Sequence, residues 1–461
     1  MSSLRHIFIR LLLLATALAL TVAACDNAKP TPTPKPPPTR APTATATPGP
    51  SPSPLPGATS TATPRPTPAP IEGLPFPPDL LQKLSVTEQR IINMRGLQPA
   101  GEPKRMILTR ETLAAKLKQD FESEVRESTT ILQEVLVALG LLPPSADIVS
   151  LQLKQLGDEV LGLFDPETGD LYIVTSPKGF RQLEEMTHAH EFVHALQQDH
   201  FDIKRLDDET DDDSEASAAL TALIEGDATL AGQLYAQSFL DPRRINQEAQ
   251  EIIAAIDRSS IPFVLQESLS FPYSDGLLFV RQLQLTGGWK AVNDAYADPP
   301  KTTEHILHFD KYTKREPALA VSVPDGLAAR LGDGWRLAKT DVMGELSYRI
   351  HLDAHLPRGD AIRAAAGWGG DKLLYFKGPG SEKVAAIPTR WDTQNDAKEF
   401  FEAYVKFLEA QKAEMTRSST SVAGAAGGRY HYLRITGDRT LLIIADDASQ
   451  AERLAAAIEG F

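Results

Sequence analysis

A proline-rich stretch near the N-terminus most strongly limits what this chain can fold into. Residues 26–78 consist largely of Pro, Thr, Ala and Ser and include the run KPTPTPKPPPTRAPTATATPGPSPSPLPG. Proline lacks the backbone N–H that helices and sheets use, and the segment has few apolar side chains with which to build a core. We therefore expect a disordered tether with polyproline character, which leaves residues 79–461 to form the folded body.

The residues before the tether have the pattern of an export signal. Arg5 and Arg10 accompany an apolar run, residues 11–22, that is too short to favour a permanent membrane span. The run leads into Val-Ala-Ala-Cys25, which resembles the lipobox of bacterial lipoproteins, where lipid is attached to the cysteine. We expect residues 1–25 to be a lipoprotein signal peptide and Cys25 to anchor the chain to the cell membrane, on its extracytoplasmic face. An ordinary secretory signal with an incidental cysteine is the alternative.

Composition sets further limits. Cys25 is the only cysteine in the chain, so an intramolecular disulfide is excluded and the fold must rest on its core. The net charge of −14 argues against nucleic acid as a partner. Roughly 380 residues after the tether exceed what one core usually supports, so we expect two folded units, residues 79–320 and residues 321–461.

The second unit, residues 321–461, alternates helical and strand patterns. A helical segment, DAKEFFEAYVKFLEAQKAEM, is followed by the apolar strand patterns RYHYLRITG and TLLIIADD and by a closing helical segment. This order predicts an α+β unit with an antiparallel sheet. It carries no visible catalytic constellation, so packing against the first unit or binding a partner is its expected role.

The first unit, residues 79–320, is expected to be mostly helical. Three segments between residues 79 and 140 carry apolar side chains at helical spacing. Two apolar runs then flank Asp165-Pro166-Glu167-Thr168-Gly169, which predicts a β-hairpin.

The next segment, MTHAHEFVHALQQDHF, contains the most informative motif. His190 and His194 stand four residues apart, so on a helix their rings lie one turn from each other and can reach a single ion. Glu191 between them is the carboxylate of the pattern HExxH, in which it accepts a proton from water activated by zinc. A surface helix with two unrelated histidines is the alternative interpretation.

Two residues compete for the place of third ligand. His200 follows His190 at the spacing of the metzincin pattern, but Gln197 occupies the position where that pattern requires a glycine. Glu225, in the Ala-rich helical segment SEASAALTALIEGDATLAGQLY, is a carboxylate among apolar neighbours, which is unfavourable unless it is paired or binds a metal. A partly exposed charge is the alternative for Glu225.

HEFVHALQQDHF followed by ALIEGDA resembles the gluzincins, the HExxH-plus-Glu zinc metallopeptidases, and in particular a group of bacterial lipoproteins with this pair of motifs. The resemblance covers most of the chain after the tether. It implies that His190, His194 and Glu225 hold zinc and that Glu191 is the general base. It also implies a zincin-like, mostly helical catalytic domain with a small sheet against the active-site helix. In such peptidases the sheet edge beside that helix pairs with an extended substrate, a role for which the hairpin is the candidate.

Other functional positions are less sharply defined. Zinc peptidases usually bring a His or Tyr to the developing oxyanion, and His308 in TTEHILHFDKY matches a TExxLHP stretch of the lipoprotein group except that Phe replaces its proline. The other candidates for this role are His305, Tyr296 and Tyr273. Asp199 and Asp227 could orient the histidines. The acidic run 207–215 could bind calcium, although a solvated loop with a helix cap at Asp213 or Ser214 is the simpler interpretation.

These observations lead to one expectation and one alternative. We expect a lipid-anchored, extracytoplasmic zinc metallopeptidase that acts on a peptide or protein substrate. The alternative is a cell-surface binding or scaffold lipoprotein whose zinc site is structural or degenerate. The intact Glu191 favours the peptidase, because a structural site closes with four protein ligands and needs no adjacent base.

Overall fold

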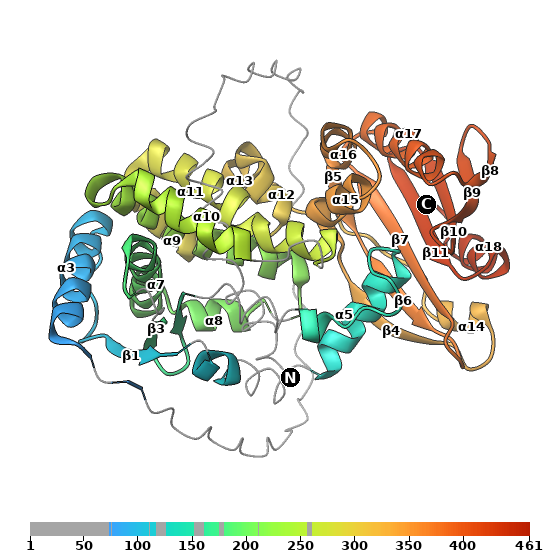
Figure 1. Cartoon of the computed structure of the whole chain (residues 1–461). Coiled ribbons are helices and arrows are strands. Elements are labelled where there is room, and N and C mark those ends of the chain that lie inside the picture. Colours follow the sequence, from blue (N-terminus) through green and yellow to red (C-terminus); the bar gives the residue numbers. More distant parts are fainter. Residues whose placement is uncertain are drawn as a thin grey trace, which may run out of the picture.

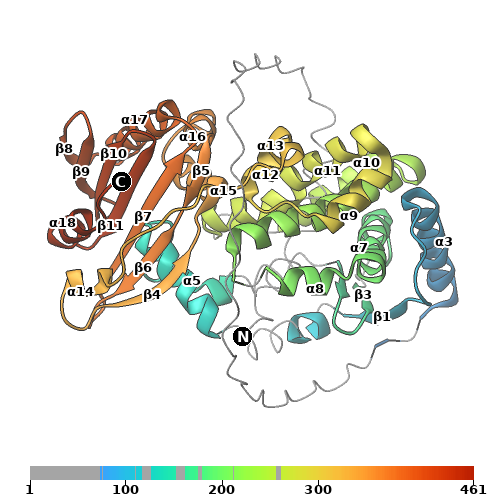
Figure 2. The same ribbon diagram turned by 180° about the vertical axis from the view of Figure 1, so that it is seen from behind.

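The computed structural model describes residues 73–74, 76–109, 111–116, 126–151, 161–174, 179–210, 212–255 and 261–461. The expected signal peptide, Cys25 and almost all of the tether lie outside these residues. The described chain forms a mainly helical unit and, beside it, an α+β unit (Figure 1), and the same two units are seen from behind in Figure 2. The predicted mixture of helix and sheet is confirmed. Within the described ranges, no helix has the length and apolar character needed to cross a membrane.

A three-stranded sheet lies at the base of the helical unit. Its strands are β1 (Lys104–Leu108), β3 (Asp170–Val174) and β2 (Gly162–Asp165), in the order β1-β3-β2. β1 is parallel to β3, whereas β2 is antiparallel to it. β2 and β3 are the predicted hairpin. Its turn is held by a hydrogen bond from the Glu167 backbone N–H to Asp165, and Gly169 adopts φ 73° there, which glycine tolerates without strain.

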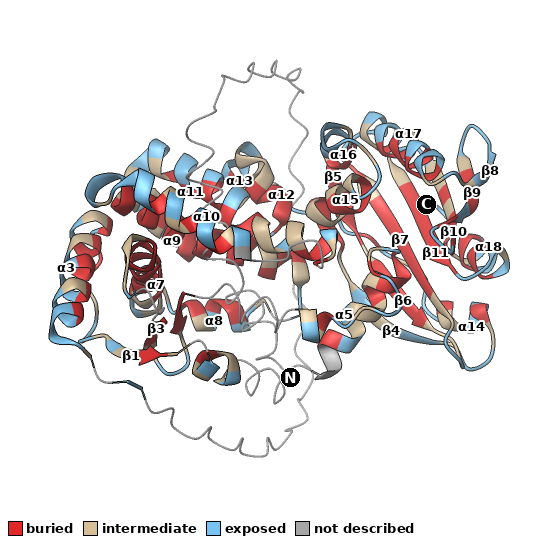
Figure 3. Ribbon diagram, in the orientation of Figure 1, coloured by how far each residue is buried: buried red, intermediate tan, exposed pale blue. Residues whose placement is uncertain are grey.

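The motif helix, α7 (Gln182–Phe201), packs between this sheet and the long helix α9 (Ser214–Phe239). Leu183, Met186, Phe192 and Val193 are fully buried on different sides of α7. Figure 3 shows the same: α7 is buried along most of its length. From Leu183 to His194 every residue of α7 is buried, so polar side chains there must find partners inside the protein, whereas Asp199 and His200 at the end of the helix are exposed.

Helix α11 (Phe263–Ala297) packs closely against α9. A Cβ on Gly226 would lie 2.3 Å from the carbonyl oxygen of Gly276, and one on Gly276 would lie 2.3 Å from that of Ala222. The absence of side chains at these two positions therefore allows the backbones to touch. α11 bends at Gly287 and Gly288, whose backbone angles are not helical.

The remaining described helices of this unit surround the α7, α9 and α11 core. They are α3 (Pro78–Arg95), α8 (Ile203–Asp208), α10 (Pro242–Ala255), α12 (Thr303–Leu307) and α13 (Phe309–Lys314). Of the second helix expected between residues 79 and 140, residues 111–116 are helical, and residues 117–125 lie outside the described chain.

The α+β unit is built on an antiparallel sheet, as predicted. The strands follow the order β4-β6-β7-β11-β10-β9-β8, and β5 also pairs with β7. Their bounds are β4 (Arg336–Asp341), β5 (Trp368–Asp371), β6 (Leu373–Lys377), β7 (Lys383–Trp391), β8 (Glu414–Arg417), β9 (Ser421–Ala426), β10 (Arg429–Thr436) and β11 (Arg439–Ala445).

Helices cover both faces of this sheet. One face packs against α15 (Gly344–Asp353), α16 (Arg358–Ala365) and α17 (Gln394–Ala410), and the other against α14 (Leu327–Leu331) and α18 (Ala448–Ala457). Helix α5 (Arg126–Ala138) also packs on the first face, where Val135 and Ala138 join the core. The sequence places α5 in the first unit, so a boundary at residue 320 does not separate the two cores completely.

Candidate metal centre

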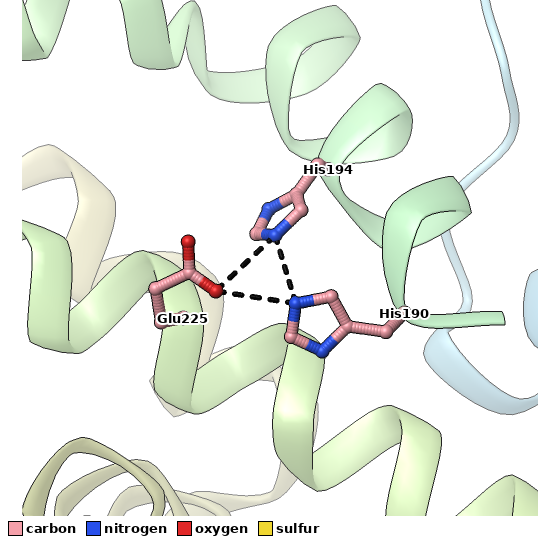
Figure 4. Close-up of side chains that lie close together, drawn as sticks. All are labelled: His190, His194 and Glu225. Atoms are coloured by element: carbon pink, nitrogen blue, oxygen red, sulfur yellow. Dashed lines mark hydrogen bonds and ion pairs between the residues drawn. The ribbon is translucent and has the colours of Figure 1, made fainter. Parts of the chain in front are cut away.

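Three predicted ligands come together between α7 and α9. The Nε2 atoms of His190 and His194 are 3.0 Å apart, and Oε2 of Glu225 lies 3.1 Å from the first and 3.4 Å from the second. Figure 4 shows the three side chains pointing toward one another from the two helices. All three residues are buried, and Glu225 is only 1% exposed, which contradicts the alternative of a surface charge.

The residues present fit a metal ion. Zinc ligands at about 2.0–2.2 Å in tetrahedral geometry stand roughly 3.3 Å from one another, close to the spacing of these three atoms. The second carboxylate oxygen of Glu225, Oε1, is buried and has no hydrogen-bond partner in the described chain. Because an uncompensated buried carboxylate is costly, a cation at this point would stabilise the arrangement. His190, His194 and Glu225 could therefore bind a metal ion.

His200, the competing ligand, lies elsewhere. Its Nε2 atom is 2.7 Å from the backbone carbonyl of Gln98, and the side chain is on the protein surface. The structure thus groups Glu225, and not His200, with the histidine pair.

The pKa values of the three candidate ligands are shifted in different directions. Burial, together with the charge of His194, lowers the pKa of His190 to about 4. Burial would also lower the pKa of His194, but the Glu225 carboxylate outweighs it and raises this pKa to about 9. Burial opposes ionisation of Glu225 as well, yet the two histidines lower its pKa to about 2. Without metal, the cluster is therefore a buried ion pair of His194 with Glu225, and a metal ion must displace its proton.

The side chain of Glu191 extends from α7 to the edge strand β2. Its Oε2 accepts a hydrogen bond of 2.8 Å from the backbone N–H of Phe164. Gly162 allows β2 to approach so closely, because a Cβ there would meet Thr187 at 3.1 Å and Glu191 at 3.3 Å. Burial, assisted by the charge of Glu225, raises the pKa of Glu191 to about 7, against the opposing effects of His194 and the Phe164 N–H. A carboxyl with this pKa can both accept and return a proton near neutral pH.

Of the four candidates for the oxyanion role, Tyr273 lies against the cluster. Its ring stacks on that of His190, with centroids 6.2 Å apart. The hydroxyl is buried and makes no hydrogen bond of good geometry among the described residues, although the Glu225 carboxylate lies close enough to interact with it. Burial, and then the charges of Glu225 and Glu191, raise the pKa of Tyr273 well above its ordinary value, so the hydroxyl stays protonated and able to donate.

The other three candidates have different partners. His308, the first choice from the sequence, pairs with Glu345 of α15 at 2.9 Å. His305 contacts the backbone carbonyl of Glu316, and Tyr296 donates to Asp227. Of the four candidates, Tyr273 is therefore the one whose ring contacts the cluster, which its spacing in the sequence did not reveal, whereas the role of His308 remains a prediction.

A second layer of contacts orients His194. Its Nδ1 lies 2.8 Å from Oε1 of Gln197, and Nε2 of Gln197 donates to Asp227 at 3.0 Å. Of the two expected aspartates, Asp227 thus reaches the site through Gln197, whereas Asp199 accepts from the backbone N–H of Ala100. Gln197 was missed as a positioning residue, although its place three residues after His194, on the same helix face, was a signal.

The acidic run 207–215 supplies a helix cap. Oδ1 of Asp213 accepts the backbone N–H groups of Glu215 and Ala216 at the start of α9, as one interpretation predicted. Apart from the His190, His194 and Glu225 cluster, the described residues contain no grouping of potential metal ligands, and residue 211 of the run lies outside them. The calcium hypothesis therefore has no support in the described part of the run.

The comparisons with known proteins concern the C-terminal unit. Residues 333–455 match a family described as a domain of unknown function, DUF8575, and this region extends from just before β4 into α18. Neither the curated proteins nor the solved structures include a match. The cluster of His190, His194 and Glu225 lies outside the matched residues.

Proposed function

We propose that this protein is a zinc-dependent metallopeptidase of the gluzincin type, with a zincin-like catalytic unit. The observation that carries the proposal is the convergence of His190, His194 and Glu225 on one point, with Glu191 beside them in the HExxH arrangement. The arrangement of α7 against a small sheet, with α9 supplying the third ligand, supports the zincin-like assignment.

Zinc is the metal that this donor set suits best. Two imidazole nitrogens and one carboxylate oxygen are the protein ligands of catalytic zinc sites that keep one position open. When bound, zinc would supply Lewis acidity, which polarises a carbonyl group and lowers the pKa of water.

The chain's own residues then have distinct tasks. Glu191 accepts a proton from the attacking water and delivers it to the leaving amine, which its pKa of about 7 permits near neutral pH. The Tyr273 hydroxyl donates a hydrogen bond to the oxygen on which negative charge develops. The edge strand β2 holds the peptide in extended form beside α7, since β3 pairs with β2 on one side alone.

An apolar cavity of about 340 Å³ opens along α9 on the N-terminal side of Glu225, and the residues of the cluster do not line it. It lies between α5, α9, α11 and α15, with aliphatic walls that include Leu136, Leu265 and Ile350. On α9 it is lined by Ala218 and Thr221, which stand seven and four residues before Glu225 and so share its helix face. We propose that the cavity receives apolar side chains of the bound peptide or protein.

The proposal includes the location of the enzyme. A signal peptide and a lipidated Cys25 would place the catalytic unit outside the cytoplasm, held on the membrane by the tether of residues 26–78. Cys25→Ser should abolish incorporation of labelled lipid, and persistent labelling would refute the anchor. The proposal includes no nucleic-acid partner, because the net charge of −14 argues against one.

The test separates the peptidase from a binding or scaffold lipoprotein. Zinc content and hydrolysis of a mixed peptide library are measured for the wild type and for Glu191→Gln. We expect equal zinc content and at least a 100-fold lower rate in the variant, because the amide cannot accept the proton. Equal turnover in both proteins would refute Glu191 as the general base. A zinc-loaded wild type without turnover would favour the binding lipoprotein.

A further inference from the structure

A continuous chain of buried contacts joins the metal cluster to the N-terminal helix α3. His194 contacts Gln197 at 2.8 Å, Gln197 donates to Asp227 at 3.0 Å, and Asp227 accepts two hydrogen bonds from Arg95, at 2.9 and 3.0 Å. The side chains of Arg95 and Asp227 are both 0% exposed. Arg95 is the last residue of α3, about 95 positions before the HExxH motif, and no pattern in the motif itself implicates it.

Donor and acceptor are fixed at each step of this series of contacts, because Arg95 can only donate hydrogen bonds and Nε2 of Gln197 faces groups that can only accept them. A guanidinium only donates, so the Asp227 carboxylate acts toward Arg95 as acceptor. Nε2 of Gln197 faces two acceptors, Asp227 and the backbone carbonyl of Ile224 at 3.0 Å, so this end of the amide must be the NH2 group. Oε1 of Gln197 therefore faces His194, and Nδ1 of His194 must carry the proton.

This direction determines which nitrogen of His194 can bind a metal. With the proton held at Nδ1, a neutral His194 keeps the lone pair at Nε2, the atom that points to His190 and Glu225. The same hydrogen bond fixes the orientation of the ring about its Cβ–Cγ bond. Two acceptors, Asp227 and the Ile224 carbonyl, hold the Gln197 amide in this orientation. Loss of Asp227 as acceptor would leave only the Ile224 carbonyl to oppose rotation of the amide, which would offer His194 a donor in place of an acceptor.

At the α3 end of this series of contacts, Arg95 and Asp227 are also held by residues of α11. The Arg95 guanidinium lies over the Trp289 ring, 4.5 Å from its centroid, and Asp227 also accepts the Tyr296 hydroxyl at 2.9 Å. Trp289 and Tyr296 follow the bend of α11 at Gly287 and Gly288, so α3 and the end of α11 enclose the same carboxylate. Arg95 is thus the fixed hydrogen-bond donor at the end of the series of contacts that leads from Asp227 through Gln197 to His194.

We propose that Arg95 is a positioning residue for the metal centre: through Asp227 and Gln197 it sets the tautomer and orientation of His194, so that docking of α3 controls metal affinity. This inference rests on the metal site of the proposed function but not on peptidase activity. By linkage, a metal ion stabilises the docked state of α3 to the same degree.

The experiment uses the full chain without its signal peptide and measures zinc affinity by competition with a chromophoric chelator. Gln197→Leu removes the link at similar volume. The double variant Arg95→Met/Asp227→Asn removes both buried charges together, since Arg95→Met alone would leave the Asp227 charge unpaired and could prevent folding. Arg90→Met is the matched control, because Arg90 lies on α3 but contacts Tyr235 and Phe239.

We call Gln197→Leu and Arg95→Met/Asp227→Asn the relay variants. We expect both to fold and to bind zinc about 10- to 100-fold more weakly, as is typical when a residue that orients a ligand is removed. Arg90→Met should stay within about threefold of the wild type. A spectroscopic measurement separates positioning from a general structural effect. In the Co2+-loaded protein the paramagnetically shifted Nδ1–H proton of His194 should exchange slowly with solvent in the wild type and in Arg90→Met, and rapidly in the relay variants.

Unchanged zinc affinity and slow exchange in the folded relay variants would overturn the proposal. An equal loss of affinity in Arg90→Met would also overturn it, because any disturbance of α3 would then suffice. If the wild type binds zinc but cleaves no peptide, the peptidase function fails while this inference stands. A wild type that binds no zinc would overturn both.

Discussion

Nε2 of His190 lies 3.1 Å from Oε2 of Glu225, although the two residues are 35 positions apart and belong to different helices, α7 and α9. The contact is fully buried, and the third ligand atom, from His194, completes it. The pair therefore shows which carboxylate belongs to the candidate metal centre.

Removal of Glu225 should abolish metal binding. We expect about one zinc per chain in the wild type and little in Glu225→Ala, because two histidines alone cannot hold the ion tightly. His200→Ala is the matched control, since His200 contacts the backbone of Gln98 away from the cluster. Metal content by atomic absorption checks the prediction, and treatment with a chelator should lower the melting temperature of the wild type more than that of Glu225→Ala. Zinc loss in His200→Ala with retention in Glu225→Ala would reinstate the metzincin interpretation.

Tyr273→Phe should impair catalysis without loss of metal. The hydroxyl is not one of the three candidate ligands, and its one polar neighbour is the Glu225 carboxylate, with which it makes no hydrogen bond of good geometry, so the resting protein should lose little. If it stabilises the oxyanion, kcat should fall about 100-fold at nearly unchanged KM. His308→Ala, which breaks the contact with Glu345, is the comparison. A large loss of kcat in His308→Ala but not in Tyr273→Phe would return the role to His308.

Gly226→Ala should destabilise the helical unit. The new methyl group would stand 2.3 Å from the Gly276 carbonyl oxygen, so α9 and α11 would have to separate. We expect a loss of more than ~2 kcal/mol in the free energy of unfolding. Gly232→Ala on the same helix is the control: its Cβ would meet atoms no closer than 3.7 Å, and alanine favours helix by up to ~1 kcal/mol. Similar urea midpoints for the two variants would contradict the close contact of α9 with α11.

A buried histidine should make the α+β unit sensitive to acid. His351 lies against the rings of Tyr404 and Phe407, and both of its ring nitrogens are buried without hydrogen-bond partners in the described chain. Burial, with the charges of His431 and His355, lowers the pKa of His351 to about 3. The folded-state pKa is thus below that of the unfolded chain, so the stabilising effect is complete above pH 6.5 and is lost as the pH falls toward 3.

His351→Phe should remove this dependence. Between pH 7 and pH 4 the wild type should lose up to about 3 kcal/mol more than the variant, which has a ring of similar size that does not ionise. Urea unfolding at the two pH values measures the difference. Parallel losses in both proteins would show that His351 does not titrate in this range.

The sequence by itself indicated the residues that form the candidate site. The four-residue spacing of His190 and His194 defines one helix face whatever the tertiary structure, and the turn residues 165–169 between apolar runs specify a hairpin locally. The antiparallel sheet of the C-terminal unit followed from alternation and turn signals of the same local kind. The roles of Cys25 and of the tether remain predictions, because they lie outside the described residues.

The tertiary structure decided what depends on contacts between distant segments. Tyr273 lies on α11 and Arg95 on α3. No spacing along the sequence shows that Tyr273 contacts His190 or that Arg95 reaches the cluster through Asp227 and Gln197. Helix α5 packs against a sheet formed more than 200 residues later, since its apolar face finds a partner there. Local patterns determine periodicity and therefore secondary structure, whereas the choice of partner for a buried polar group depends on how whole elements pack. The sequence could therefore name the candidate metal ligands, but not the contacts that Tyr273 and Arg95 make.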